Sequence, residues 1–294
     1  MIAQVLFIKS PTQENKMSIH KYILLIIILA FTSLVNANRV YPGFVNPESA
    51  VQSKNGDIYV TEFGERGKDG DGKIKKINAN GEISDFATGL NDPRGLIIYK
   101  GEIYATDKDV IIKVDMNDGS WEVFSGTMAF PKTPVLLNDI AVTPSGTFYI
   151  TDSGNLKDGG MVFIMDMTGN LELLMDENSH PSIKAPNGVL PLDENRFLLV
   201  DFATGVLFEG NKKNVSLKKL TDGLGAGDGI VFLNDSVLIS DWKNGVIHEY
   251  RNGSLVTLKY RFESAADIAP TFDRKSIIVP DMKAGTVSVI DIEK

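Results

Sequence analysis

The sequence predicts an all-β protein, a six-bladed β-propeller with four antiparallel strands in each blade. Three observations predict it: a motif that recurs six times, spacings of 40 to 49 residues between its copies, and no segment with the period of an amphipathic helix. Each copy consists of a turn, an alternating run of strand-forming residues and an acidic residue, usually followed by glycine. These six acids, called the marker acids below, are Glu62, Asp107, Asp152, Asp201, Asp241 and Asp281.

The first repeat shows how four strands fill one blade. Strand-forming residues predict strands at 50–53, 58–62, 73–78 and 82–86. The first pair is separated by Asn55-Gly56 and the last pair by Asn80-Gly81. Asn-Gly favours a hairpin turn because it adopts the positive φ angles that such turns require.

The ring is predicted to close with a strand from the N-terminal side. The sixth copy ends soon after its third strand, at 286–292, so the fourth strand has to come from elsewhere in the chain. Residues 39–45 precede the first blade and belong to no other predicted strand. Pairing them with the sixth blade would close the ring and leave no exposed sheet edge there.

A secretory signal peptide is expected at residues 1–37. Lys16 and Lys21 precede an apolar run at 22–35, and a small-residue cleavage site ends at Ala37. The run is shorter than the roughly 20 residues that a membrane-spanning helix needs. We therefore expect an exported protein, periplasmic or extracellular, with no membrane attachment after the leader is removed. Met17, just before the basic region, is a candidate for the true start.

The propeller domain at 38–294 is acidic. Loss of residues 1–37 removes three Lys and one Glu, which takes the formal net charge from −8 to −10. Nucleic acid is therefore not an expected partner, because binding phosphates needs a basic face. The chain has no Cys, so it tolerates an oxidising compartment without using disulfides. The sequence leaves the oligomeric state open.

The Asp residues among the marker acids are interpreted as structural, because Asp at a strand end caps the following turn with its carboxylate.

A second polar set recurs 13 or 14 residues before each marker acid. It comprises Glu48, Pro93 or Arg94, Asn138, Asn187, Asp228 and Asp267. We expect these residues at the start of each innermost strand, so that five of the six blades present an oxygen-bearing side chain at one level of the axis.

Such a ring of carboxylate and amide oxygens suits a hard divalent cation, and suits Zn²⁺ or Cu²⁺ poorly without Cys or His. Two carboxylates about 5 Å apart repel by roughly 3 kcal/mol at an effective dielectric near 20, which also favours a bound cation. The alternative is that these are turn residues, since Asn-Gly and Asp-Gly are ordinary turn dipeptides.

At these positions the sequence resembles the gluconolactonase/regucalcin/luciferin-regenerating family. Glu48, Asn138, Asn187 and Asp228 follow the blade order Glu, Asn, Asn, Asp that this family uses around its metal. The segments at 137–140, 149–152 and 186–189, which read LNDI, YITD and PNGV, resemble the family's third- and fourth-blade motifs. The likeness covers essentially the whole chain after residue 37 and is strongest from 134 to 245.

The resemblance implies a channel cation, Ca²⁺ first and Mn²⁺, Mg²⁺ or Zn²⁺ as alternatives. It implies that Glu48, Asn187 and Asp228 bind this ion and that Asn138 lies beside it as a further oxygen donor and substrate contact. Asp228 and Asn138 are the implied catalytic residues, Asp228 as the candidate base. Asp267 has no metal role in the family and is a candidate substrate contact.

The sequence departs from the family's pattern at Leu136, where sugar lactonases often have Arg, so a polyhydroxylated substrate is in doubt. Arg94 is either a cation at the channel mouth, where it would contact substrate, or a surface turn residue after Pro93.

Three functions remain in view. The first is a hydrolase that acts on a small molecule, a lactone or related ester. The second is a non-catalytic exported binding propeller with a structural channel cation. The third, a streptogramin-lyase or NHL-like propeller, is suggested by residues 90–96 but lacks a well-placed catalytic His.

Overall fold

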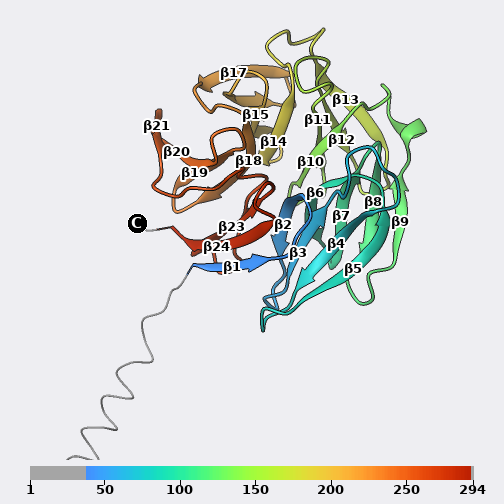
Figure 1. Cartoon of the computed structure of the whole chain (residues 1–294). Helices are drawn as coiled ribbons and strands as arrows, with labels where there is room; N and C mark the ends of the chain where they lie inside the picture. Colours follow the sequence, from blue (N-terminus) through green and yellow to red (C-terminus); the bar gives the residue numbers. More distant parts are fainter. Residues whose placement is uncertain (1–37, 293–294) are drawn as a thin grey trace, which may run out of the picture. The chain divides into compact units, whose positions relative to one another are not determined.

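The computed structural model describes residues 38–292, which form six four-stranded antiparallel sheets arranged around one axis (Figure 1). This confirms the predicted all-β, six-bladed propeller. The predicted signal peptide, residues 1–37, lies outside the described residues. Within 38–292 the only helix is a single 3₁₀ turn, Thr127–Ala129, and no helix there is long and apolar enough to cross a membrane.

Five blades take their four strands consecutively from the chain, from the axis outward. Blade 1 is β2 (Pro47–Gln52), β3 (Ile58–Glu62), β4 (Gly72–Ile77) and β5 (Ile83–Leu90). Blade 2 is β6 (Pro93–Tyr99), β7 (Glu102–Asp107), β8 (Val110–Asp115) and β9 (Trp121–Ser125). Blade 3 is β10 (Leu137–Val142), β11 (Phe148–Asp152), β12 (Met161–Met165) and β13 (Leu171–Asp176). Blade 4 is β14 (Pro186–Pro191), β15 (Arg196–Asp201), β16 (Val206–Asn211) and β17 (Ser216–Thr221). Blade 5 is β18 (Gly227–Leu233), β19 (Ser236–Asp241), β20 (Val246–Arg251) and β21 (Ser254–Thr257).

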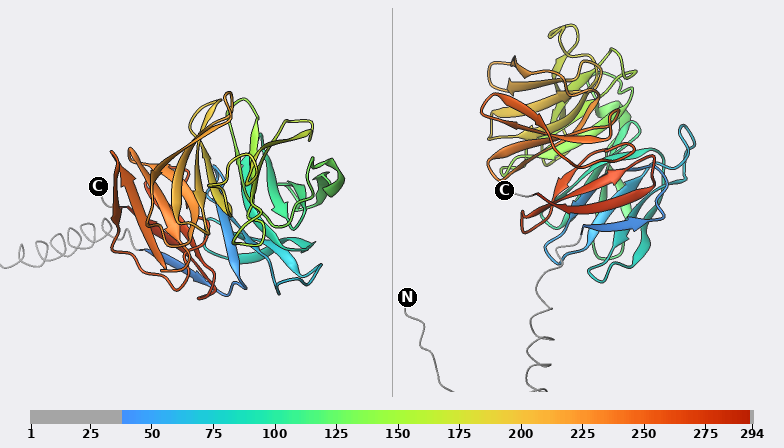
Figure 2. Two further views of the ribbon diagram at one scale, coloured as in Figure 1. Left: turned by 90° about the horizontal axis from the view of Figure 1, so that it is seen from above. Right: turned by 60° about the vertical axis from the view of Figure 1, so that its left-hand side comes forward.

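Blade 6 joins the two ends of the described chain. It consists of β22 (Ala269–Pro270), β23 (Ser276–Asp281), β24 (Thr286–Asp291) and, as its outermost strand, β1 (Arg39–Pro42). The blue β1 lies beside the red β24 in Figures 1 and 2, antiparallel, with Arg39 opposite Val289. The predicted closing strand is therefore confirmed, although it ends at Pro42. Gly43 has a φ of 94°, a left-handed conformation that ends the extended run.

The four strands predicted for blade 1 are all present, but their two Asn-Gly turns differ from the expectation. Only the glycine of each pair has a positive φ, 94° at Gly56 and 88° at Gly81. Each glycine is the last residue of a three-residue loop. The residues on either side of the loop are joined by a backbone hydrogen bond: Ser53 N donates to Asp57 O, and Asn78 N donates to Glu82 O.

The core lies between the blades. Apolar side chains from facing sheets form shared clusters, such as the one that joins Tyr104 of blade 2 to Phe148 of blade 3, whose rings lie 5.0 Å apart. The same arrangement joins Tyr149 of blade 3 to Phe197 of blade 4, again at 5.0 Å. Because each blade buries its apolar faces only against its neighbours, the six sheets form one domain and their innermost strands are held around the axis.

Candidate functional site

The marker acids fix the start of each innermost strand. The Asp152 carboxylate accepts hydrogen bonds from Val135 N at 2.6 Å and Leu136 N at 3.1 Å, just before β10 begins. The carboxylates of Asp107, Asp201 and Asp281 likewise accept hydrogen bonds from two backbone N–H groups in the equivalent segments of their own blades. Asp241 and Glu62 each accept one backbone hydrogen bond from this segment. Asp152 also accepts Gly154 N, in the turn that follows. The structural interpretation is confirmed, with an addition: these acids also clamp the segment that enters the innermost strand.

One strand register repeats in five blades and brings the predicted side chains to one level of the axis. In each blade the first residue of the innermost strand pairs with the marker acid, as Leu137 pairs with Asp152. The next residue is the predicted site residue, and all five of these are buried: Glu48, Arg94, Asn138, Asn187 and Asp228. We call them the axial residues.

Blade 6 corrects the sequence prediction. Ala265 bridges to Asp281, so the position equivalent to the axial residues is Ala266, and Asp267 lies one residue further on. The hairpin after β22 is one residue longer than the hairpin after β10. Counting back 14 residues from the marker acid Asp281 therefore reaches Asp267 instead of the equivalent residue, Ala266.

Asp267 instead corresponds to Asp139 of blade 3, and both side chains reach into the next blade. The Asp139 carboxylate accepts Val189 N of blade 4 at 2.7 Å. Asp267 accepts a short hydrogen bond from Ser49 Oγ of blade 1. Sequence reasoning missed Asp139, although the shared tripeptide Asp-Ile-Ala at 139–141 and 267–269 would have aligned the two acids.

The centre of the propeller contains more acidic than basic side chains. Glu48, Asp139 and Asp228 are buried there, Asp267 is half-buried, and the cation among them is Arg94, whose Nη1 lies 3.8 Å from Glu48 Oε1. Burial, and then the charge of Asp228, raise the pKa of Glu48 well above its usual range, while Arg94 opposes the shift. Burial and the charge of Asp267 raise the pKa of Asp228 in the same way. The cluster therefore favours uptake of protons or of a cation.

Three oxygens of the axial residues have no hydrogen-bond partner: Glu48 Oε2, Asn187 Oδ1 and Asp228 Oδ1. They come from blades 1, 4 and 5. A buried polar atom without a partner costs about 1–3 kcal/mol, and more when charged. Two carboxylates and an amide oxygen are ligands that a hard divalent cation accepts, so this donor set fits one. Residues 38–292 contain no group of three or more His, Cys, Asp or Glu side chains placed to hold a metal. The set above has two such residues, completed by an amide.

Asn138 and Arg94 are held at the same level by specific contacts. Asn138 Nδ2 donates to Ser153 Oγ at 2.9 Å, and Ser153 Oγ donates to Pro186 O at 2.7 Å, which fixes the orientation of the amide. The guanidinium carbon of Arg94 lies 4.9 Å from the centroid of the Phe63 ring. Arg94 is only 6% exposed, so its interpretation as a surface turn residue is wrong.

Both histidines of the described chain have partners away from the axial residues. His248 Nε2 lies 3.3 Å from Asp241 Oδ2, and its Nδ1 lies 3.1 Å from Thr257 Oγ1, within blade 5. His180 Nε2 lies 2.9 Å from the carbonyl oxygen of Val215. Neither histidine therefore has an axial residue, Asp139 or Asp267 as a hydrogen-bond partner.

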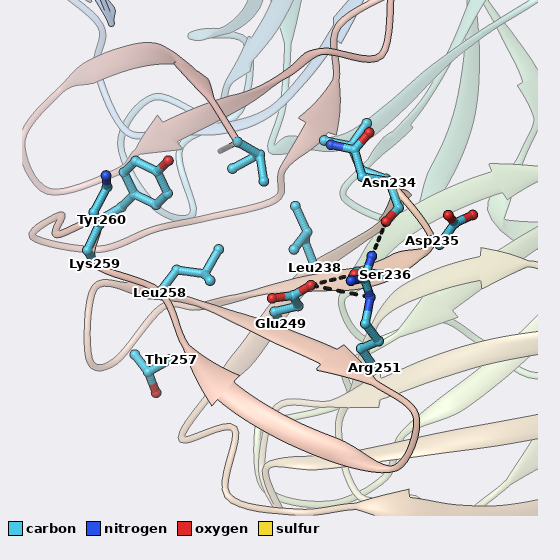
Figure 3. Close-up of a pocket in the computed structure, with 12 residues that line it drawn as sticks. Asn234, Asp235, Ser236, Leu238, Glu249, Arg251, Thr257, Leu258, Lys259 and Tyr260 are labelled. Carbon is cyan, nitrogen blue, oxygen red and sulfur yellow. Dashed lines mark hydrogen bonds and ion pairs between the residues drawn. The ribbon is translucent and has the colours of Figure 1, made fainter. Parts of the chain in front are cut away.

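A cavity of about 600 Å³ lies away from these residues, on the outer part of blade 5 (Figure 3). Leu238, Leu258 and Tyr260 contribute much of its apolar lining. Several of its polar groups are paired within the protein: Glu249 with Ser236 and Arg251, and the Tyr260 hydroxyl with Asp291 O at 2.6 Å. No axial residue lines it, and its lining has none of the unpartnered buried atoms found at the axis. We therefore place the candidate site at the axis.

Fold and site together define a six-bladed β-propeller with a buried, acid-rich centre where its innermost strands begin. No family model matches the chain, and no curated protein matches it. The structure is similar to that of regucalcin from Agrobacterium tumefaciens, described as a calcium-binding protein, with a TM-score of 0.68 and 16% identity over 87% of this chain and 94% of that one. It is also similar to a chain of a nidogen/laminin complex, with a TM-score of 0.60 and 19% identity over 72% of this chain and 79% of that one. At these identities the likeness shows the six-bladed fold.

Proposed function

We propose that the chain is a divalent-cation-dependent hydrolase of a lactone or related ester, related to the regucalcin-type propellers. One observation carries the proposal: Glu48, Asn187 and Asp228 come from three different blades and each leaves one buried oxygen without a partner. A purely structural polar core would satisfy these atoms within the protein.

Ca²⁺ is the proposed ion, and Mn²⁺, Mg²⁺ and Zn²⁺ are the alternatives. Two points support Ca²⁺. The donors are all oxygens, which suits a hard ion. Regucalcin, which shares the fold, is described as calcium-binding. Glu48, Asn187 and Asp228 would hold the ion, with Asn138 beside it. A bound divalent cation would polarise the carbonyl group of the ester.

The remaining chemistry belongs to the residues around it. Asp228 accepts the proton of the attacking water, because its buried carboxylate lies beside the proposed cation. Asn138, oriented by Ser153, donates toward the oxygen on which negative charge develops. Arg94 offsets part of the acidic charge through Glu48, and its unpartnered Nε is a second donor available to substrate.

The proposal is tested with a panel of lactones and aryl esters, assayed after dialysis against EDTA and after each of the four metals is added back. We expect hydrolysis that EDTA abolishes and Ca²⁺ restores. A control variant, Asp222→Asn, removes an exposed carboxylate away from the axis and is expected to keep full activity. An enzyme that is fully active in EDTA, or inactive on every substrate with every metal, would refute the proposal.

We also propose that the chain is exported and that its leader is removed. An apolar run followed by a small-residue cleavage site at Ala37 supports it. Mass spectrometry of the protein recovered from the periplasm or the medium should find a chain that begins at Asn38. Recovery of the uncleaved chain from the cytoplasm would contradict it.

The alternative is a binding propeller whose cation is structural. It is supported by the similarity to a chain from a nidogen/laminin complex. The two functions differ in the effect of the metal: a structural ion changes stability without any turnover, whereas the proposed hydrolase needs it for catalysis.

A further inference from the structure

A second set of six side chains follows the second strand of each blade. It is formed by the residue after each marker acid: Phe63, Lys108, Ser153, Phe202, Trp242 and Met282. In five blades the backbone N–H of this residue donates to the carbonyl oxygen of the residue that precedes the strand partner of the marker acid, as Trp242 N donates to Ala226 O at 2.9 Å. In blades 2 to 5 this acceptor lies two positions before the axial residue. We call this set the outer ring.

Two direct contacts tie the outer ring to the axial residues. The Phe63 ring lies against the guanidinium of Arg94, and Ser153 Oγ accepts the hydrogen bond from Asn138. Side chains of the outer ring thus adjoin the groups that the proposed function assigns to substrate and cation.

The outer ring is divided by polarity. Lys108 and Ser153, in blades 2 and 3, are polar. Phe202, Trp242 and Met282, in blades 4, 5 and 6, form a continuous apolar band: the Phe202 and Trp242 ring centroids are 6.0 Å apart, and Trp242 Nε1 lies 3.3 Å from Met282 Sδ. All three are half-buried, so part of each side chain remains accessible.

Equivalent backbone positions relate this band to the axial residues. In blade 3 the same position holds Ser153, whose Oγ accepts a hydrogen bond from the axial residue Asn138. Phe202 N and Trp242 N bond to Ala185 O and Ala226 O as Ser153 N bonds to Leu136 O, so these side chains start from the same place in blades 4 and 5. A substituent on a molecule bound at the axial residues can therefore extend toward the band. Lys283 Nζ lies over the Trp242 ring, 4.4 Å from its centroid, and this cation–π contact helps to hold the indole.

We propose that the band of Phe202, Trp242 and Met282 is the specificity surface of the site, and that it selects a lactone or ester carrying an apolar substituent over a polyhydroxylated one. Burying aliphatic carbons against aromatic and thioether side chains is favourable, whereas burying hydroxyl groups there leaves them without hydrogen-bond partners. The inference rests on the proposed function, so its test measures binding separately from turnover.

The binding test uses the two tryptophans of the chain. Trp121 lies on the outer strand β9, with its Nε1 bonded to Thr88 O. The variant Trp121→Phe therefore leaves Trp242 as the only tryptophan. Three lactams serve as non-hydrolysable probes in the presence of Ca²⁺: 5-hexyl-2-pyrrolidinone, 2-pyrrolidinone and the polyhydroxylated gluconolactam. We expect the hexyl lactam to change the Trp242 emission and to bind about tenfold or more tightly than the other two.

A turnover test runs beside it. The ratio of kcat/KM for γ-decalactone to that for γ-butyrolactone should exceed one in the wild type and fall about tenfold in Phe202→Ala, mainly through KM for the decalactone. Phe272→Ala is the matched control, because Phe272 is an exposed phenylalanine in the loop at the opposite end of blade 6, and this variant should keep the wild-type ratio.

The outcomes separate the two proposals. Hexyl-lactam binding at Trp242 without hydrolysis of any lactone would refute the proposed function and support the apolar band. Hydrolysis that is metal-dependent but insensitive to chain length and to Phe202→Ala would support the function and overturn the band. Tighter binding of gluconolactam than of the hexyl lactam would also overturn it.

Discussion

Asp228 combines two properties that the marker acid Asp152 lacks. It is buried beside other acids, and one of its carboxylate oxygens has no partner. Asp152, by contrast, is equally buried but accepts three backbone N–H groups. The hydrogen-bond partners of each carboxylate thus distinguish a candidate site residue from a marker acid with a structural role.

A single substitution tests the role of Asp228. Asp228→Asn keeps an oxygen for the cation but removes its charge and its basicity. We expect Ca²⁺ affinity to fall about tenfold and kcat to fall by about 10²-fold or more, with metal binding measured by calorimetry and turnover at saturating Ca²⁺. Removing one of several buried like charges should leave the apo fold at least as stable. Full turnover in this variant would show that another group is the base.

The position of each innermost strand depends on the hydrogen bonds that the marker acids accept. Asp152→Ala leaves the N–H groups of Val135, Leu136 and Gly154 without their acceptor. We expect the free energy of unfolding to fall by about 3 kcal/mol, at about 1 kcal/mol for each lost hydrogen bond. Denaturant titration measures the loss, and Asp152→Asn, which keeps one acceptor oxygen, should lose less. Equal stability of all three proteins would show that the clamp adds nothing.

The closing strand is the second element that can be tested. A chain that starts at Asn38 is compared with one that starts at Gly43 and so lacks β1. Without β1, the β24 edge has no partner and Tyr41 no longer covers the apolar cluster of blades 1 and 6. We expect a lower Tm and concentration-dependent aggregation, because an unpaired strand edge pairs with other chains. Calorimetry and light scattering measure both effects. An unchanged Tm in the shorter chain would contradict the closure.

The buried acids make the stability of the whole molecule depend on pH. Burial is the main cause that raises the pKa of Asp107 and of Asp139 to about 6, whereas an Asp in an unfolded chain titrates near 3.9. Below both values the folded and the unfolded forms are equally protonated at these groups. Between about pH 4 and 6 the unfolded form releases the protons first, so stability falls as pH rises, by up to about 3 kcal/mol for each group.

In EDTA we therefore expect Tm to decrease from pH 4.5 to 6.5. Ca²⁺ should raise Tm more at pH 7 than at pH 5, because its carboxylate ligands must be ionised to bind it. Differential scanning fluorimetry across this range measures both. Asp107→Asn should flatten the decline without changing the Ca²⁺ effect. A Tm that rises with pH over this window in EDTA would contradict the assigned direction of the shifts.

Prediction from sequence succeeded where the pattern is local. Glu48, Asn138, Asn187 and Asp228 occupy equivalent positions because the distance from strand start to marker acid varies by only one residue between their blades. It was wrong at Asp267, where one extra hairpin residue shifts the register. It missed Asp139, whose side chain acts on the next blade.

The sequence by itself determined the number of blades, the four strands of blade 1, the closure of the ring by a segment within 39–45 and the equivalent positions of Glu48, Asn138, Asn187 and Asp228. These follow from alternation, turn residues and a repeat length, all of which are properties of neighbouring residues. Only the tertiary structure decided that Arg94 is buried against Glu48, that Asp139 and Asp267 bridge adjacent blades, and that Phe202, Trp242 and Met282 form one band. Such contacts join residues 40 or more positions apart, and their formation depends on how the ring brings the blades together.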